Sequence, residues 1–218
     1  MVQFSSDVDI LKYEPVLFGE LHLPWQVKAA GTGATLASTC LTAGDADFLA
    51  AGVASGYVIH LRSPDGSLDG VYEIISVDAP TQLTLSVLRA DPADAAVSPP
   101  PATNIAYRIS TLSPQAVDVA LQLTEYFGIR PGDPASAYGI EDIMDVGVLR
   151  RASTFAVISC VYATWASQAA NENLWTKSLH YKQQFEKARL RCRLSVDWGG
   201  NGAGDLIRTP GSIRLVRG

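Results

Sequence analysis

Residues 149–171 read LRRASTFAVISCVYATWASQAAN, and this stretch decides the class of fold. Between Phe155 and Trp165 it is apolar almost all round, which is typical of a helix buried on every side. It predicts a central helix that other elements of the chain or of a neighbour must cover.

Residues 174–194, LWTKSLHYKQQFEKARLRCRL, predict a second helix directly after it. Apolar residues recur at spacings of seven, four and three, with Lys or Arg between them, which is the pattern of an amphipathic helix. The apolar positions are Leu174, Tyr181, Phe185 and Ala188.

A run of short strands is predicted between residues 34 and 111. Five segments are rich in β-branched and aromatic residues: 34–39, 57–62, 70–78, 82–89 and 104–111. Turn signals such as Pro64-Asp65-Gly66 link the second, third and fourth of them, so these three are expected to form a meander. Five short strands suit a small barrel, with a helical turn at residues 45–51 that closes one end with Phe48.

Other segments connect these parts. Residues 90–103 contain four prolines and little that could be buried, which predicts an exposed loop. A helix is expected from Ser113-Pro114, where Ser caps and Pro takes the first helical position, to Gly128. Its buried face is predicted to carry Val117, Leu121, Thr124 and Phe127.

The fold class expected is α+β: a helical bundle with a small β-barrel-like domain inserted after the N-terminal segment, and an extended C-terminal tail. The predicted boundaries place residues 1–30 and 112–198 in the bundle, 31–111 in the inserted β-domain and 199–218 in the tail.

Charge is distributed unevenly along the chain. The net charge is −5, but residues 1–148 hold 6 Lys and Arg against 18 Asp and Glu, whereas residues 149–218 hold 11 against 4. Such asymmetry fits a basic part that binds nucleic acid, or acidic and basic faces of neighbouring copies that meet head to tail. A solvated helix face is the third interpretation.

Composition argues against several classes. Three scattered cysteines, without a CxxC pair, indicate neither a disulfide framework nor a zinc site, and we interpret all three as packing thiols. No leader pattern opens the chain, and the apolar run at residues 155–166 is shorter than a bilayer requires, so a soluble protein without membrane contact is expected.

Catalytic and metal-binding patterns are weak. His22, His60 and His180 lie far apart with no nucleophile elbow, P-loop or HExxH, which predicts no catalytic residue, no cofactor and no enzyme activity. His60 is expected on the outer face of its strand, opposite Ile59 and Leu61. The segment 197–205 resembles a calcium loop only loosely, because ligands at alternate positions and a terminal Glu are missing, so no metal site is predicted.

The final helices and the tail resemble the head-to-tail adaptor (connector or neck) proteins of tailed bacteriophages. The residues that carry the resemblance are Leu149-Arg150-Arg151-Ala152-Ser153, then 173–186 (NLWTKSLHYKQQFE), then Leu194-Ser195-Val196-Asp197 with its Gly-Gly-Asn-Gly turn, and finally Ile213-Arg214-Leu215-Val216-Arg217. The middle is similar as well, since 46–53 (ADFLAAGV) and 56–59 (GYVI) resemble the β-domain of some adaptors.

The resemblance implies a virion structural protein at the neck, assembled in the host cytoplasm. It implies a homo-oligomeric ring, of twelve copies, that joins the portal protein to the stopper or tail, with DNA passing through its channel without sequence-specific binding. The alternating tail is expected to bind the portal by strand addition through Ile213, Arg214, Leu215, Val216 and Arg217. Lys182, Arg189 and Arg193 fall roughly on one helical face and are expected at the subunit interface.

Three other functions stay open. A tail-terminator or tail-completion ring protein would have a sheet-dominated core. A nucleic-acid-binding module would use the basic helix, with Lys177, Lys187 and Arg191 among its cations and a steep salt dependence. A hydrolase would need a constellation in the β-domain that the sequence does not reveal.

Overall fold

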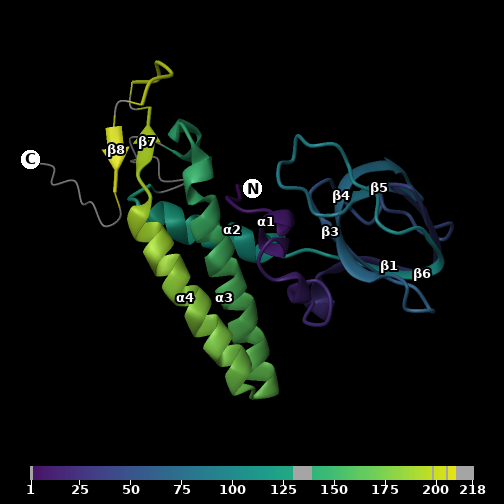
Figure 1. The fold of residues 1–218 in the computed structure, drawn as a ribbon. Helices are drawn as coiled ribbons and strands as arrows, with labels where there is room; N and C mark the ends of the chain where they lie inside the picture. Colours follow the sequence, from purple (N-terminus) through teal and green to yellow (C-terminus); the bar gives the residue numbers. More distant parts are fainter. Residues whose placement is uncertain (1, 130–138, 198, 205, 210–218) are drawn as a thin grey trace, which may run out of the picture. The chain divides into compact units, whose positions relative to one another are not determined.

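The computed structural model describes residues 2–129, 139–197, 199–204 and 206–209 and divides the chain into two compact units (Figure 1). The helical unit comprises Met1–Ser5 and Ser113–Gly218, and the barrel unit comprises Ser6–Leu112. The protein is therefore α+β, with the barrel unit inserted into the helical unit. Residues 6–30 group with the barrel, whereas the sequence analysis placed them with the helices.

Six antiparallel strands form a closed barrel in the order β1-β2-β5-β4-β3-β6, with β6 paired back to β1. Their bounds are β1 (Val27–Ala37), β2 (Cys40–Thr42), β3 (Val58–Arg62), β4 (Asp69–Ala79), β5 (Gln82–Ser86) and β6 (Ala102–Ser110). The meander β3-β4-β5 is confirmed. The count of five strands was wrong, because the first segment continues past Ser38, at φ 53°, into the three-residue strand β2.

The barrel core is filled by residues that alternate along the strands, as the pleat requires. Ile59 and Leu61 of β3 are fully buried in it, whereas His60 between them lies outside, as predicted. Phe48 is also fully buried in this core and meets Tyr107 edge to face, with ring centroids 5.7 Å apart.

The segment that carries Phe48 consists of turns, one of which is helical: the Ala51 N–H donates to the Asp47 carbonyl oxygen at 3.0 Å. Phe48 N–H donates to the Pro80 carbonyl oxygen at 2.7 Å, and Ala50 N–H donates to the Asp47 carboxylate at 2.9 Å. The bond to the Asp47 carboxylate is the one that an N-cap residue makes, and the helical path ends after this one turn at Gly52, whose φ is 66°.

The N-terminal part of the barrel unit contains α1 (Asp7–Leu11) and the 3-10 turns η1 (Pro15–Leu17) and η2 (Pro24–Gln26). Ser6 and Asp9 form a capping box at the start of α1. The Arg108 side chain of β6 donates to the Gly19 carbonyl oxygen at 2.6 Å, which fastens this segment to the barrel.

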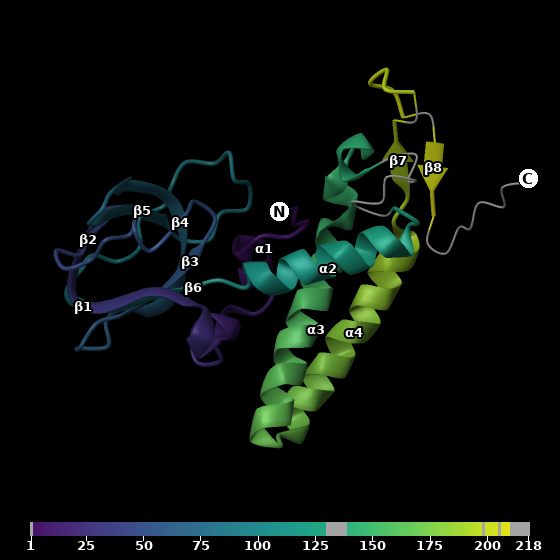
Figure 2. The same cartoon turned by 180° about the vertical axis from the view of Figure 1, so that it is seen from behind.

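Over its described residues, the helical unit has three α-helices of 14 to 20 residues and a small hairpin. Its elements are α2 (Ser113–Tyr126), η3 (Ile140–Asp142), η4 (Val146–Leu149), α3 (Arg150–Ala169), α4 (Glu172–Arg191), β7 (Leu194–Val196) and β8 (Leu206–Arg208). Helices α3 and α4 run side by side in opposite directions, and α2 crosses them (Figures 1 and 2).

Aromatic side chains and serines join α3 to α4. Tyr181 stacks on Tyr162, with centroids 6.1 Å apart, and also contacts Phe155. The Ser159 hydroxyl donates to the Ser178 carbonyl oxygen and the Ser178 hydroxyl donates to the Ser159 carbonyl oxygen, both at 2.9 Å. The predicted apolar stripe of α4 is confirmed, because its four residues are half-buried.

The burial of α3 agrees with the prediction of a helix covered on every side only in the first half of the helix. Residues 152–158 are all buried, but Cys160 is exposed and Trp165 is half-buried, so the helix is not covered on every side along its whole length. Cys160 is therefore not a packing thiol, and Cys40 is only half-buried.

Helix α2 begins at Ser113, and Gly128, at φ 72°, follows its end, as expected. Its buried face was predicted partly wrongly. Thr124 and Phe127 are buried, but Leu121 is 47% exposed, and Ala116, Val119, Ala120 and Leu123 complete the face.

The chain after α4 forms an antiparallel hairpin between β7 and β8, and β8 belongs to the segment 199–218 that the sequence analysis assigned to an extended tail. In the turn between them, the Asp197 carboxylate accepts the backbone N–H groups of Asn201 and Gly202. These hydrogen bonds, with that from Gly202 the strongest, lower the pKa of Asp197.

Residues Val146–Ala169 are long and apolar enough to cross a membrane, by length and composition alone. The prediction that no apolar run reaches that length was wrong. Of the apolar window, 61% is buried inside the protein, and core helices pass the same test, so this is weak support for a membrane span.

Candidate functional site

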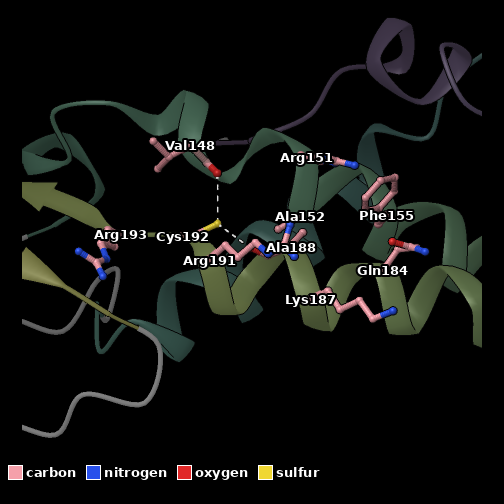
Figure 3. Close-up of a pocket in the computed structure, with 10 residues that line it drawn as sticks. All are labelled: Val148, Arg151, Ala152, Phe155, Gln184, Lys187, Ala188, Arg191, Cys192 and Arg193. Atoms are coloured by element: carbon pink, nitrogen blue, oxygen red, sulfur yellow. Dashed lines mark hydrogen bonds between the residues drawn. The ribbon is translucent and has the colours of Figure 1, made fainter.

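A cleft of about 480 Å³ lies at the junction of α3 and α4, entirely within the helical unit (Figure 3). We call it the cationic cleft. It is lined by Val148, Arg151, Ala152, Phe155, Gln184, Lys187, Ala188, Arg191, Cys192 and Arg193. Phe155 and Gln184 lie at one end and Arg193 at the other, with Ala152 and Ala188 between them.

The antiparallel pairing of the helices explains why cations gather here. Lys187 and Arg191 are four residues apart on α4, so they project from one face of its last two turns. Arg151 belongs to the first turn of α3, which the hairpin places beside the last turns of α4. Its guanidinium lies 5.3 Å from the centre of the Phe155 ring.

The electrostatics of the cleft are one-sided. Its lining includes two cations from α4, one from α3 and Arg193, but no carboxylate. In the part of the chain that the structure describes, the ion pairs are His60–Asp69, Arg62–Asp69 and Glu73–Arg89, so the cations of the cleft have no partner of opposite charge. The floor is apolar, formed by Val148, Ala152 and Ala188. The cleft is suited to an anionic group that carries apolar atoms beside its charge.

Cys192 lies between Val148 and Ala188 in the lining of the cleft. Its thiol donates to the Val148 carbonyl oxygen at 3.2 Å and to the Ala188 carbonyl oxygen at 3.3 Å (Figure 3). Burial raises the pKa of the Cys192 thiol, so the sulfur keeps its proton and its role as a donor.

The three residues predicted at a subunit interface have different surroundings. Lys182 is exposed on α4, and Arg193 is exposed and lines the cleft. Arg189 packs inside the helical unit: its guanidinium carbon lies 3.6 Å from the Tyr126 ring centre and 4.9 Å from that of Phe185. The structure therefore does not bring the three together as one charged face.

The five residues predicted to bind a portal, Ile213, Arg214, Leu215, Val216 and Arg217, lie outside the described residues.

Sequence reasoning missed Arg151 as a site residue and the grouping of Lys187 with Arg191, which it named only among the cations of a nucleic-acid-binding helix. The available signal was the position of Arg151 at the start of one helix and of Arg191 at the end of the next. In a helical hairpin with a short connection these two ends lie together.

The histidines do not form a catalytic arrangement. His60 Nε2 lies 2.9 Å from the Asp69 carboxylate and its Nδ1 lies 3.3 Å from the Arg108 guanidinium, so both ring nitrogens have structural partners. Burial, and then the charge of Arg108, lower the pKa of His22. His180 contacts the ring of Tyr181 on α4, in the other unit.

A second hollow, of about 610 Å³, lies on the barrel unit beside the turn after β3. It includes Asp65, whose pKa is lowered to about 2, first by the Ser63 hydroxyl and then by the amide and hydroxyl of Ser67. Such a carboxylate is a poor general base near neutral pH. Among the residues described, no group of three His, Cys, Asp or Glu side chains is placed to hold a metal ion.

Comparison of the chain with models of protein families, with curated proteins and with solved structures gives no match. The cationic cleft and the two-unit architecture are therefore the basis for a functional proposal.

Proposed function

We propose that this protein is a virion structural protein: a head-to-tail adaptor of a tailed bacteriophage that forms a ring between the portal and the stopper or tail. The observation that carries the proposal is the helical unit itself. Two helices of 20 residues pack along each other and lead into a hairpin with an Asp-Gly-rich turn. The resemblance to adaptors rests on the sequences of these two helices and of the Gly-Gly-Asn-Gly turn that follows them.

An exposed apolar face on α4 supports a role in assembly. Trp175, Leu179 and Leu190 are 50%, 43% and 66% exposed. At 100° per residue they fall within one narrow sector of the helix, and Lys182 lies next to the same sector. Large apolar side chains gathered on one exposed helix face are typical of a surface that another protein covers. In the proposed ring this face contacts a neighbouring subunit.

The separation of charge between the two units also favours head-to-tail contacts. The barrel unit holds 5 Lys and Arg against 12 Asp and Glu, whereas residues 150–193 of the helical unit hold 8 against 2. Different faces of opposite charge make heterologous contacts, which close into rings when the rotation between copies allows it.

The cations of α4 also favour a second candidate, a nucleic-acid-binding module. This function predicts an affinity of the isolated protein for duplex DNA that falls steeply with salt concentration. The tail-terminator alternative is less favoured, because a sheet-dominated core would not need two 20-residue helices.

The test of the main proposal mixes the purified protein with its cognate portal and images the product by electron cryo-microscopy. We expect a ring stacked coaxially on the portal. A protein that does not associate with the portal at micromolar concentrations would refute the adaptor function.

The proposed portal contact of residues 213–217 has a separate test. Truncation after Thr209 keeps β8 and removes these residues, so the hairpin is expected to remain intact. We expect the truncated protein to lose attachment to the portal while it keeps its thermal stability. Attachment that persists after truncation would assign the contact to another surface.

A further inference from the structure

We propose that the cationic cleft binds an acidic turn of a second copy of this chain, centred on Asp45, Asp47 and Leu49. This inference deepens the proposed ring, on which it rests, by naming both sides of the subunit contact. It follows from the chemistry of the cleft and from a surface of the barrel unit that matches it.

The cleft sets three requirements for its occupant. The occupant must carry more than one negative charge, because four cations line the cleft without a carboxylate among them. It must also carry an apolar side chain, because exposed Val148 and half-buried Ala188 would otherwise lose hydration without gaining a contact. It must project far enough to enter a hollow of about 480 Å³. A nucleic-acid backbone meets the first requirement but has no aliphatic side chain for the floor.

The turn at residues 45–51 meets the requirements of charge and of an apolar side chain, and both are exposed. Asp45 and Asp47 are exposed, and Leu49, two residues further on, is 55% exposed. One carboxylate oxygen of Asp47 accepts the Ala50 N–H, which fixes the turn. Within the described part of the chain, neither Asp45 nor Asp47 belongs to an ion pair, so both charges remain available.

The turn is also anchored in the barrel core. Phe48 is fully buried in the barrel core, and its N–H is bonded to the Pro80 carbonyl oxygen. Because the residue between Asp47 and Leu49 is anchored, the turn is preorganised for binding and loses little conformational entropy when it docks.

Several other acidic residues of the barrel unit fit less well. Asp69 is paired with His60 and Arg62, and Glu73 with Arg89. Asp91 and Asp94 lie in the field of Arg89, which donates to the Asp94 carbonyl oxygen at 2.6 Å. Asp65 is surrounded by serines and has no large exposed apolar neighbour at residues 63–68.

A charge-exchange experiment tests the contact. The first variant, Lys187→Glu with Arg191→Glu, cancels the net charge of the four cations of the cleft, and the second, Asp45→Lys with Asp47→Lys, makes the turn positive. Neither variant alone has both the native cleft and the native turn, whereas in the mixture the native cleft of the turn variant can bind the native turn of the cleft variant. We expect each variant to self-associate about tenfold or more weakly than wild type in sedimentation velocity at low salt, and the equimolar mixture to recover association.

The matched control is Lys12→Glu with Lys28→Glu, which reverses two exposed cations of the barrel unit and so changes the net charge by the same amount as the cleft variant. It is expected to associate like wild type. Thermal melts of all variants establish that they are folded. Equal loss in the control, or no recovery in the mixture, would overturn the proposed contact.

Photo-cross-linking keeps the test decisive when association is weak. A benzophenone amino acid at position 49 is expected to cross-link, between copies, to peptides that contain Phe155 or residues 184–193. If the protein forms a ring on the portal but position 49 cross-links to other residues, the proposed contact is wrong and the adaptor function is unaffected. The proposed contact would also be overturned if no intermolecular cross-link formed at any concentration. It would be overturned as well if the wild-type protein bound duplex DNA and the cleft variant did not.

Discussion

The backbone N–H of Leu112 donates a 2.8 Å hydrogen bond to Oδ1 of Asp7, and this bond joins the first helix of the barrel unit to the residue at which the unit ends. The carboxylate is buried, and its Oδ2 has no hydrogen-bond partner. Burial raises the pKa of Asp7 to about 7, although hydrogen bonds from Thr111 and Leu112 act in the opposite direction. One side chain therefore ties the ends of the unit together and makes its stability depend on pH.

The first prediction concerns this dependence. The pKa of Asp7 is higher in the folded than in the unfolded chain. The contribution of Asp7 to the stability of the fold is therefore fully present below about pH 4 and is lost as the pH rises to about 7. We expect the free energy of unfolding to fall by about 2–4 kcal/mol over that range on account of this group. In Asp7→Asn, which keeps an acceptor for Leu112, this part of the pH dependence should disappear.

Urea unfolding of both proteins at half-unit steps between pH 4 and 8 measures the difference. Other carboxyl groups titrate in both proteins alike, so only the difference between the two curves reports Asp7. Parallel curves would show that Asp7 is ionised normally in the folded protein.

The second prediction concerns the buried ion pair of Glu73 and Arg89. Their closest atoms are 2.8 Å apart, a second bond joins Arg89 Nε to the carboxylate, and the side chains are 7% and 10% exposed. Arg89→Met leaves the Glu73 charge buried without a partner, so we expect a loss of about 3–5 kcal/mol of stability. Adding Glu73→Leu should restore most of it.

The exposed pair of Arg62 and Asp69 provides the control. Its atoms are 3.6 Å apart and its side chains are 71% and 50% exposed, so Arg62→Met should cost less than about 1 kcal/mol. Chemical denaturation measures both variants. Similar losses of stability in Arg62→Met and Arg89→Met would contradict the expected difference between the exposed and the buried ion pair.

The third prediction concerns Arg189, whose guanidinium lies between the Tyr126 and Phe185 rings. Arg189→Ala should destabilise the protein by about 1–2 kcal/mol, because stacking and packing are lost together with the charge. Arg189→Lys should recover less than half, since an ammonium group cannot stack as a planar guanidinium does. Exposed Arg191→Ala is the matched control and should change the stability by less than about 0.5 kcal/mol. Full rescue by lysine would show that only the charge is needed.

The fourth prediction concerns Gly31 in β1, which pairs with Tyr107 of β6. A Cβ at this position would lie 2.7 Å from the Tyr107 hydroxyl oxygen and 2.9 Å from its ring, so Gly31→Ala should cost about 1–3 kcal/mol in thermal unfolding. Gly44→Ala is the control, because a Cβ there meets nothing within 4 Å. An unchanged stability of Gly31→Ala would mean that the Tyr107 ring moves aside without a cost in stability.

The sequence by itself determined which elements form and where several of them begin and end. The apolar run after Leu149 and the amphipathic run after Asn173 gave the two long helices, and Ser113-Pro114 with Gly128 gave the bounds of α2. Alternation placed His60 outside the barrel and Ile59 inside it. These features follow from local backbone preference and from periodicity, which are properties of short segments.

Only the tertiary structure decided how the segments combine. Barrel closure depends on β1 pairing with β6, more than 60 residues further along, and the hairpin of β7 with β8 fixes a segment that the sequence left as a tail. The cationic cleft likewise requires Arg151 and Arg191 to meet across the α3–α4 hairpin, while Arg189 turns inward to the Tyr126 ring. Contacts between distant segments depend on register and packing across the whole unit, and these are properties that no local pattern specifies.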